Sequence, residues 1–487
     1  MTIRALRLGG WKHPVLREDD LHAVHAATLR VLERTGVDVG SAPIRSALAA
    51  AGAIVRGDGI RVRFPPDLVE AALRVAPRTL LLAGRDPGLD LALDGDHGFL
   101  SVDGSAAEIL DPDTGRRRPS TGRDLERVTR LADVLPEIGF LWQGVEAGDV
   151  PAPVRPLHEL RIQLRSSSKH VQLMTAVTPL AAEGAVAMAA AVAGGEDALR
   201  ARPLLSSFQV CLSPLTFAGE ALEAALCYAR AGVPAGFVVM PIACATGPAT
   251  PAGIVVQSNA ELLAGIAIVE TLVPGAPTFY GACPTVLDLR SVSVACGGPE
   301  DVLFQAALGQ LGDWYGLPTS IGTFATGAKA PDWQAGFENA ISGMASLLGG
   351  ADMLSGAGLL HAARTFSLEE MVLDAEMFGA LCRVSEGLAV GPEALAVDVI
   401  DAVGPGGNYL AERHTVAHMR SLWRPTVYDR RTWEDWEAAG RPAPPERAGE
   451  RVRELLATHE PAPLPDGVPD ELDAIVAAFT AWTVAAS

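Results

Sequence analysis

Aromatic residues stand at the ends of four apolar runs, although Phe, Trp and Tyr make up only 5% of the chain: Trp142, Phe208, Tyr280 and Phe324. The face of an aromatic ring attracts a cation, and several rings together can cage a quaternary ammonium group. Asp103 ends another run, where a carboxylate would serve as a general base or as the counter-charge of a cation. The pattern favours a cation pocket if the fold gathers the run ends. The competing interpretation is core packing, because alternate side chains of a strand point to opposite faces.

A further group of candidate residues follows the run that begins near residue 317. It comprises Thr323, Phe324, Thr326, Gly327, Lys329, Asp332 and Gln334. Lys329 would bind a substrate carboxylate or lie free in solvent, and Asp332 suits the start of a helix. His361, after the last run, would act in the pocket or lie in a surface loop. His170 begins a run, so we expect a hydrogen-bonded structural residue there.

Three cysteines occupy equivalent places after successive runs: Cys211, Cys244 and Cys283. Three thiolates at one site could hold Zn²⁺ and leave its fourth position open, as a thiol methyltransferase would require. Free cysteine is also a small core residue that suits crowded strand ends, and no loop has closely spaced Cys and His ligands. The sequence leaves both interpretations open.

The elements that must position these residues are eight short apolar runs, spaced 31 to 41 residues apart. Each reads as a strand, and the segment after it has helical periodicity, as in residues 123–135 (RDLERVTRLADVL). Eight strand–helix units predict a closed (β/α)8 barrel, a fold whose chemistry lies on the loops after the strands. The runs begin near residues 98, 139, 170, 205, 236, 276, 317 and 352.

The organisation along the chain predicts three parts. Residues 1–97 form an α+β cap with hairpins, residues 98–397 form the barrel, and residues 398–487 form a helical extension over one end of it. We expect this extension to contribute to a homo-oligomer.

Composition narrows the classes of protein that the chain can represent. A net charge of −19 argues against nucleic acid and anionic membrane as partners. The first residues lack the apolar core of a secretory signal, the six scattered cysteines do not form a disulfide framework, and the stretch 181–194 is too short to span a membrane. These features predict a cytoplasmic protein.

Several stretches of the chain resemble one known family in the correct order. Residues 322–338 (GTFATGAKAPDWQAGFE), 367–376 (SLEEMVLDAE) and 404–436 (GPGGNYL to RTWEDW) resemble the trimethylamine methyltransferase (MttB-type) superfamily. Residues 247–250, 259–261 and 274–277 are similar to the same pattern. The founding members carry pyrrolysine, which this chain lacks, so it resembles the non-pyrrolysine branch that demethylates glycine betaine and related betaines.

The resemblance implies a methyltransferase that moves a methyl group from a quaternary amine to the Co(I) corrinoid (cobalamin) of a small partner protein. It implies no tightly bound metal. In that framework Trp142, Phe208, Tyr280 and Phe324 would cage the ammonium, and Asp103, Lys329 and His361 would supply charge. Small residues at the strand ends, Gly281, Thr323, Gly327 and Gly356, would leave clearance for the corrin ring. The zinc thiol methyltransferase and a non-catalytic betaine-binding barrel remain the alternatives.

Overall fold

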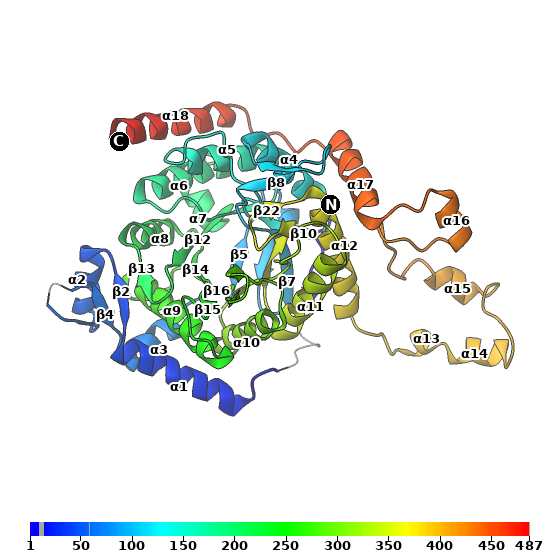
Figure 1. Ribbon diagram of the computed structural model, residues 1–487, viewed down its shortest axis with the longest axis horizontal. Helices are drawn as coiled ribbons and strands as arrows, with labels where there is room; N and C mark the ends of the chain where they lie inside the picture. Colours follow the sequence, from blue (N-terminus) through cyan, green and yellow to red (C-terminus); the bar gives the residue numbers. More distant parts are fainter. Residues whose placement is uncertain (9–13, 58, 487) are drawn as a thin grey trace.

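Eight parallel strands form a closed barrel in the computed structural model, which describes residues 1–8, 14–57 and 59–486 (Figure 1). The last strand pairs with the first, Met353 opposite Phe99, and this pairing closes the ring. A short strand, β1 (Leu6–Arg7), adds antiparallel to the first strand. The barrel strands are β7 (His97–Val102), β10 (Ile138–Leu141), β11 (His170–Leu173), β12 (Leu205–Cys211), β14 (Ala235–Val239), β16 (Tyr280–Ala282), β19 (Thr319–Gly322) and β20 (Met353–Ala357). The predicted (β/α)8 barrel is confirmed.

Eight long helices follow these strands and surround the barrel (Figure 1). Their ends carry ordinary start and stop signals: Thr121 caps the first helix by accepting a hydrogen bond from the Asp124 N–H, and left-handed glycines such as Gly232 and Gly316 end others. The helices are α4 (Gly122–Val134), α5 (Arg155–Ser166), α6 (Pro179–Ala193), α8 (Gly219–Ala231), α9 (Pro251–Leu272), α10 (Pro299–Tyr315), α11 (Trp333–Gly349) and α12 (Leu368–Ser385). A short α7 (Glu196–Ala201) lies between α6 and β12.

A hairpin of β5 (Leu80–Leu82) and β6 (Leu91–Leu93) closes the amino-terminal end of the barrel. Its leucines share one apolar cluster with Phe99, Phe140 and Met353 from the barrel strands. His170 is buried beside this hairpin, with Nδ1 3.2 Å from the Ala83 carbonyl oxygen and Nε2 2.8 Å from Ser206 Oγ. Its predicted structural role is confirmed. The opposite, carboxyl-terminal end, here called the mouth, is where barrels of this kind place their functional residues.

The other elements of the amino-terminal part cover the outside of α9. They are α1 (Glu18–Arg34), α2 (Ala42–Ala50), α3 (Pro66–Val75) and a sheet of β2 (Val37–Val39), β3 (Ile54–Val55) and β4 (Arg61–Arg63), to which β13 (Thr216–Phe217) of the loop after β12 adds. Of the hairpins expected in the cap, one forms from β3 and β4, although Asp58 of its turn lies outside the described residues. Among the described residues of the whole chain, α9 is the one helix that is long and apolar enough to cross a membrane. Because 78% of its apolar stretch is buried inside the protein, α9 is a core helix.

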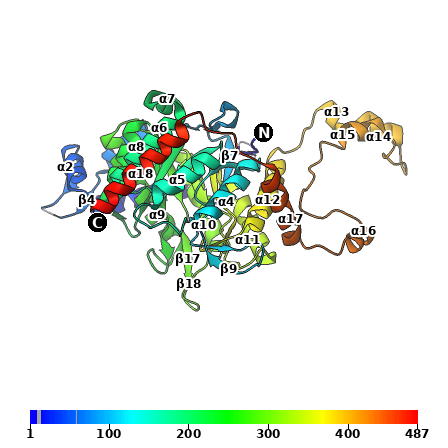
Figure 2. The same ribbon diagram turned by 90° about the horizontal axis from the view of Figure 1, so that it is seen from above.

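Short hairpins on the loops after the strands surround the mouth. They are built from β8 (Glu108–Leu110), β9 (Arg117–Pro119), β15 (Ile242–Ala243), β17 (Thr285–Asp288), β18 (Ser293–Val294), β21 (Leu359–Leu360) and β22 (Thr365–Phe366). In Figure 2 the mouth faces down, where β9, β17 and β18 lie, and the closed end faces up.

The carboxyl-terminal extension differs from the prediction in its start and in its position. The barrel ends at Ser385 of α12, and the chain then projects sideways before it returns as α17 (Pro444–Thr458) on α12 and α4. The last helix, α18 (Val468–Ala486), packs against α5 and α6. The extension therefore covers the flank of the barrel, and the prediction that it covers an end is wrong. Figure 1 shows the projecting part at the right, with α13 (Pro392–Leu395), α14 (Val397–Val403), α15 (Arg413–His418) and α16 (Trp433–Ala438).

Candidate active site

Asp103, Trp142 and Phe208 face the inside of the barrel near its mouth. Trp142 and Phe208 belong to the apolar cluster that fills the interior, and their ring centroids lie 4.5 Å apart. Phe99 of β7 is in the same cluster, so Asp103, four residues later, points the same way. The pairing of Phe140 with Ser101 on the adjacent strand brings Trp142 and Asp103 to a similar height. Two rings and one carboxyl group therefore share a wall of the mouth.

The Asp103 carboxyl group has no positive partner among the described residues. Burial raises its pKa to about 7, and the Ser355 hydroxyl and the Gly104 N–H only partly oppose this rise. Asp103 is half-buried, and a carboxylate that is shielded from water without a counter-charge is costly, which makes it a receptor for an incoming cation. Close to neutral pH the group therefore changes between a neutral and a charged form.

The interior also holds a hydrogen-bond donor that nothing in the described chain uses. Trp142 Nε1 is buried without a partner, and so is Gln143 Oε1. Buried polar atoms are normally paired, and the exceptions often lie where a ligand binds. The indole N–H would serve an acceptor atom of a bound molecule.

The prediction was wrong for the other two aromatic residues. The Tyr280 hydroxyl donates to Asn259 Oδ1 of α9 at 2.9 Å, so its ring lies between the barrel and its helices. Phe324 packs against Gly343 of α11, where a Cβ added to the glycine would lie 2.9 Å from the ring. Both side chains point out of the barrel, and neither can line its interior.

Lys329 and His361 lie together at the rim, on the loops after β19 and β20. The His361 N–H donates to the Ala328 carbonyl oxygen at 2.7 Å, and the Lys329 ammonium donates to the Gly327 carbonyl oxygen. Burial lowers the pKa of His361, and the charges of Lys329 and Arg364 lower it further. No contact in the described chain joins either residue to Asp103. They stand as rim residues, and their catalytic role stays a prediction.

The four small residues expected to give clearance to a corrin ring already have packing roles. A Cβ at Gly281 would lie 2.6 Å from the Phe237 carbonyl oxygen, and one at Gly356 would lie 1.7 Å from that of Thr323. The Thr323 hydroxyl donates to the Ser355 carbonyl oxygen at 3.1 Å, and the Gly327 N–H donates to Glu338 Oε2 at 2.9 Å. Close packing of β14, β16, β19 and β20 explains the small residues, and contact with a corrinoid stays a prediction.

The three cysteines do not form a metal site. Cys211 is buried, Cys244 is exposed and Cys283 is half-buried in the interior cluster. Burial raises the thiol pKa of both Cys211 and Cys283, which opposes the thiolate form that zinc requires. Nowhere in residues 1–8, 14–57 and 59–486 do three His, Cys, Asp or Glu side chains gather as a metal ion would need. The zinc interpretation therefore lacks its ligand set.

Strained backbone is concentrated at the mouth. Ten non-glycine residues of the described chain have positive φ, and all but Ala396 and Arg441 lie on loops that follow barrel strands. His361, Ala362 and Ala363 are left-handed in succession, with φ of 53°, 53° and 66°. Each such residue costs about 1–3 kcal/mol and is typical of a functional region. The strained residues therefore lie at the same end of the barrel as Asp103 and Trp142.

Carboxylates on the surrounding helices hold these loops, and the sequence-based interpretation missed them. Glu159 accepts the Ala147 N–H at 2.9 Å, Asp301 accepts the Gly297 N–H at 3.0 Å, and Asp374 accepts the Gly358 N–H at 2.9 Å. Burial raises the pKa of each of these three carboxyl groups to about 7. The available signal was an acidic residue in the first two turns of each of the helices α5, α10 and α12. Their role is to position the loops.

Comparison with known proteins agrees with this architecture. The family model of trimethylamine methyltransferase (MTTB) matches residues 4–481. The trimethylamine methyltransferase MttB of Desulfitobacterium hafniense (strain DSM 10664 / DCB-2) is 35% identical over 477 residues, covering 96% of this chain and 95% of the relative. The glycine betaine methyltransferase of Desulfitobacterium hafniense (strain Y51) is 32% identical, covering 96% of this chain and 97% of the relative.

A solved structure resembles the fold over nearly the whole chain. The monomethylamine methyltransferase MtmB of Methanosarcina barkeri superposes with a TM-score of 0.52 at 13% identity, covering 93% of this chain and 89% of that one. At this identity the likeness concerns the fold alone. The family match across residues 4–481, together with the 35% identity to the trimethylamine methyltransferase MttB, confirms the expected family: the chain belongs to the trimethylamine methyltransferase family, a family of methyltransferases.

Proposed function

We propose that this chain transfers a methyl group from a quaternary ammonium compound, such as glycine betaine, to the Co(I) corrinoid of a separate protein. The observation that carries the proposal is that the inside of the barrel near its mouth holds the Asp103 carboxyl group, which has no counter-charge among the described residues, and the closely packed rings of Trp142 and Phe208. A carboxylate and two aromatic faces are complementary to a bulky cation that cannot donate a hydrogen bond. The 32% identity to a glycine betaine methyltransferase supports the same substrate class.

The chemistry fits a site without a nucleophilic triad. A quaternary nitrogen already carries the positive charge that makes a tertiary amine a leaving group, so no residue has to protonate it. The Co(I) corrinoid supplies the nucleophile that accepts the methyl group. The chain's own residues hold the cation in one orientation and keep water away from it. Trp142 and Phe208 would enclose the methyl groups, and Asp103 would balance the charge.

The rim of the mouth carries exposed apolar side chains that could contact a large apolar ligand or a partner protein. Val210 lies near the end of strand β12, Leu212 follows β12 and Met240 follows β14, and these side chains are 39%, 57% and 49% exposed. In the first two turns of α11, the rings of Trp333 and Phe337 stack with centroids 5.3 Å apart and are also exposed. Exposed apolar side chains of this kind are typical of an interaction site. They would hold the corrinoid and the protein that carries it.

A substrate carboxylate would distinguish a betaine from a simple tetraalkylammonium ion. The unpaired Trp142 Nε1 is a donor inside the mouth, and Lys329 lies at its rim. We propose that one of them receives that carboxylate. A cytoplasmic location is a further part of this proposal and follows from the sequence features alone.

The testing experiment mixes the purified chain with Co(I) cobalamin and a panel of methylated amines, and follows the absorption spectrum of the cobalamin. The panel contains glycine betaine, other betaines, tetramethylammonium and trimethylamine. Methylation with one or more quaternary compounds supports the proposal. Binding of a betaine without any methylation would favour the non-catalytic barrel, and methylation with trimethylamine alone would contradict the substrate class.

A further inference from the structure

A buried glutamine of β11, Gln172, has a side-chain oxygen that no described residue uses. Gln172 is fully buried, and its Nε2 lies 3.8 Å from Met353 Sδ of β20. Because two strands of the ring, β7 and β10, separate β20 from β11, this contact runs through the barrel, so the Gln172 side chain points inward. Its Oε1 has no hydrogen-bond partner within residues 1–8, 14–57 and 59–486. A buried amide oxygen without a partner is costly and indicates a missing group beside it.

The orientation of the Gln172 amide is fixed by a chain of hydrogen bonds that starts at the closed end of the barrel. His170 Nδ1 lies 3.2 Å from the Ala83 carbonyl oxygen, which can only accept, so Nδ1 carries a proton. Burial lowers the pKa of His170 to about 4, so the ring is neutral near pH 7 and its Nε2 is an acceptor. Ser206 Oγ, 2.8 Å from that nitrogen, therefore donates to it and accepts from Gln172 Nε2 at 3.0 Å. This order leaves Oε1 as the free end of the amide.

The unpaired donor of the interior, Trp142 Nε1, stands next to this acceptor. In the pairing of β10 with β11, Leu141 lies opposite Val171, so the next positions, Trp142 and Gln172, are neighbours. Both side chains face inward, and Asp103 stands at a similar height on the other side of Trp142. Neither polar atom bonds to the other or to any residue of the described chain. One buried donor and one buried acceptor therefore lie on adjacent strands inside the barrel.

The chemical group that suits this pair must both accept and donate a hydrogen bond. A hydroxyl group does so, because its oxygen accepts from Trp142 Nε1 while its proton is donated to Gln172 Oε1. A carboxylate would satisfy the donor alone and would be repelled by the amide oxygen, and a methyl group would satisfy neither atom. A buried water molecule shares the chemistry of the hydroxyl and is the competing occupant.

The spacing of the strands sets the distance between this pair and the counter-charge of a cation. Neighbouring strands lie about 4.8 Å apart, so the backbones of Asp103 and Gln172, with β10 between them, are about 10 Å apart. A quaternary nitrogen beside Asp103 and the Trp142 ring leaves room for a short chain that crosses the indole. A hydroxyl on the second carbon from the nitrogen would reach Trp142 Nε1 and Gln172 Oε1.

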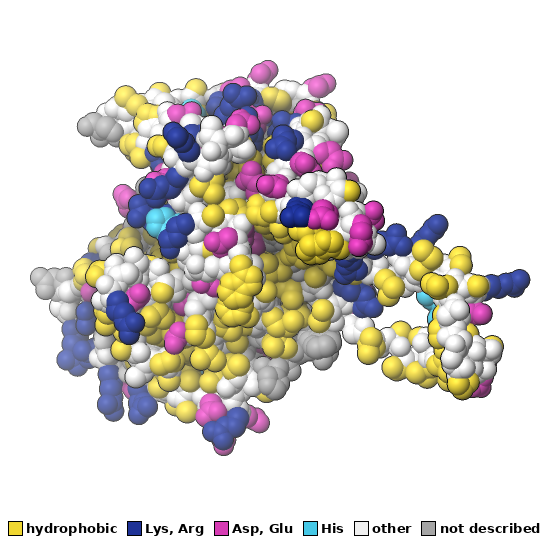
Figure 3. All heavy atoms as spheres, turned by 45° about the vertical axis from the view of Figure 1, so that its right-hand side comes forward, with side chains coloured by type: hydrophobic (Ala, Val, Ile, Leu, Met, Phe, Trp, Pro, Cys, Tyr) yellow, Lys and Arg dark blue, Asp and Glu magenta, His cyan; other side chains and the backbone are white. Residues whose placement is uncertain are grey.

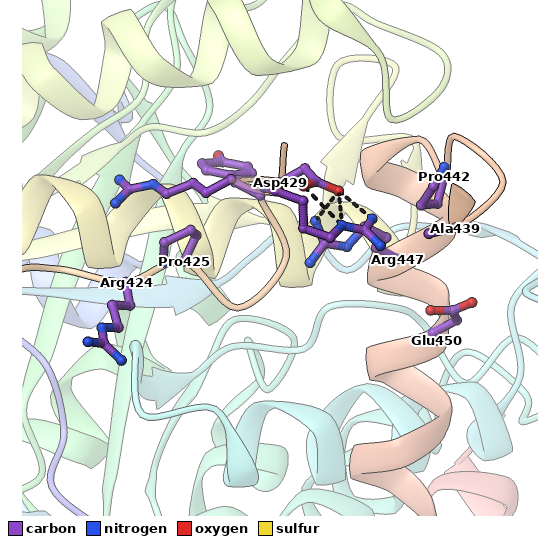
Figure 4. A pocket seen from close by; sticks show the side chains of 10 residues that line it. Arg424, Pro425, Asp429, Ala439, Pro442, Arg447 and Glu450 are labelled. Carbon is purple, nitrogen blue, oxygen red and sulfur yellow. Dashed lines mark hydrogen bonds and ion pairs between the residues drawn. The ribbon is translucent and has the colours of Figure 1, made fainter. Parts of the chain in front are cut away.

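A cavity outside the barrel has the wrong charge for such a substrate. It has a volume of about 790 Å³, lies beside α17, and is lined by Arg424, Arg430, Arg431 and Arg447. Figure 4 shows Asp429 meeting Arg447 there, and Figure 3 shows basic side chains beside the projecting helices. Guanidinium groups repel a quaternary ammonium, so the barrel interior, with Asp103, is the better match.

We propose that Trp142 Nε1 and Gln172 Oε1 bind the hydroxyl group of the substrate, and that this substrate is a quaternary ammonium compound hydroxylated on the second carbon from its nitrogen. The assignment rests on the proposed function and narrows its substrate class. Gln172 is then a residue that determines specificity, and Lys329 remains the group that would receive a substrate carboxylate.

The test compares two cations of the same charge and shape by isothermal titration calorimetry, with the full-length protein at pH 8. Choline carries the hydroxyl, and propyltrimethylammonium carries a methyl group in its place. We expect choline to bind at least about tenfold more tightly, because the analogue leaves two buried polar atoms unpaired. Equal affinities of the unmodified protein for the two cations would show that the pair holds water alone and would overturn the assignment.

Two variants of matched size attribute the preference to one residue. Gln172→Met keeps the length of the side chain and removes the acceptor, so the affinities for the two cations should become about equal. Gln209→Met is the control, because Gln209 is also buried with an unpartnered Oε1 but follows the inward Phe208 on β12 and so points outward. It should keep the preference for choline. A folded Gln172→Met variant with an unchanged preference, as judged beside its circular dichroism spectrum, would overturn the assignment.

Demethylation separates this assignment from the proposed function. With Co(I) cobalamin as acceptor, choline should have a higher kcat/KM than propyltrimethylammonium. If both cations are demethylated with the same kcat/KM, the proposed function stands and the hydroxyl assignment is wrong. If neither cation binds, the cation pocket is wrong, and the proposed function fails together with the hydroxyl assignment.

Discussion

The substitution Asp103→Asn tests the electrostatic basis of the mouth. The pKa of Asp103 rises from 3.8 to about 7 through burial. At about 1.36 kcal/mol per pKa unit, this rise corresponds to about 4 kcal/mol. Because the folded protein holds this proton more tightly than the unfolded chain, the associated stability is complete below pH 3.8 and is lost as the pH rises through 7. Asn has no charge to bury, so the variant avoids this loss.

We therefore expect the Asp103→Asn variant to be more stable than the unmodified protein at pH 8, by about 2–4 kcal/mol, and equally stable near pH 4. Urea unfolding at both pH values measures the difference. Asp96→Asn, at an exposed position next to β7, is the matched control and should show no such dependence. An unchanged stability of the Asp103→Asn variant at pH 8 would refute the assignment of Asp103 as a carboxyl group that is shielded from water and has no counter-charge.

The affinity for a cation should depend on pH in the opposite sense to the stability of the folded protein. A bound quaternary ammonium favours the charged form of Asp103, so binding below pH 7 should release a proton and affinity should rise with pH until about 8. Calorimetry with glycine betaine in two buffers of different ionisation enthalpy measures the released proton. The Asp103→Asn variant should bind more weakly and without proton release. Equal proton release by both proteins would assign the titration to another group.

Three further substitutions test the placement of single residues. Trp142→Leu should weaken glycine betaine binding about tenfold by removing a ring face, and an unchanged dissociation constant would exclude this ring from the cage. Tyr280→Phe should leave binding unchanged and lower the unfolding free energy by about 1 kcal/mol, because only its bond to Asn259 is lost. A large rise in the dissociation constant of glycine betaine would show that Tyr280 belongs to the binding site. Gly356→Ala should prevent normal folding, since its Cβ would meet the Thr323 carbonyl oxygen at 1.7 Å, and a folded, active variant would contradict this packing.

The barrel could be predicted from the sequence because the alternation of strands and helices can be recognised without knowing any contact between them. The direction in which individual side chains point could not be predicted in this way. Strands of a parallel barrel are apolar on both faces, so the run from residue 276 gives no sign that Phe279 faces inward and Tyr280 outward. Trp142 and Phe208 were assigned to the interior by the same reasoning that misplaced Tyr280 and Phe324. Only the register of neighbouring strands in the structure distinguishes the two inward rings from the two outward ones.

The loop supports and the projecting helices α13 to α16 show a second limit of the sequence. Glu159, Asp301 and Asp374 contact backbone N–H groups that lie 12, 4 and 16 residues away, and no local pattern specifies those distances. The carboxyl-terminal extension was expected as helices that cover one end of the barrel. Helices α14 and α15 form, but they contain no buried residue and their apolar side chains are exposed.

We propose above that this mouth positions a quaternary ammonium compound for methyl transfer. The most direct measurement supplies glycine betaine labelled in its methyl groups, together with Co(I) cobalamin, and quantifies both methylated cobalamin and demethylated amine. The account predicts equal amounts of the two products with the unmodified chain and a strong decrease with Asp103→Asn. Methylation that proceeds at an unchanged rate in that variant, or no methylation from any quaternary amine, would contradict it.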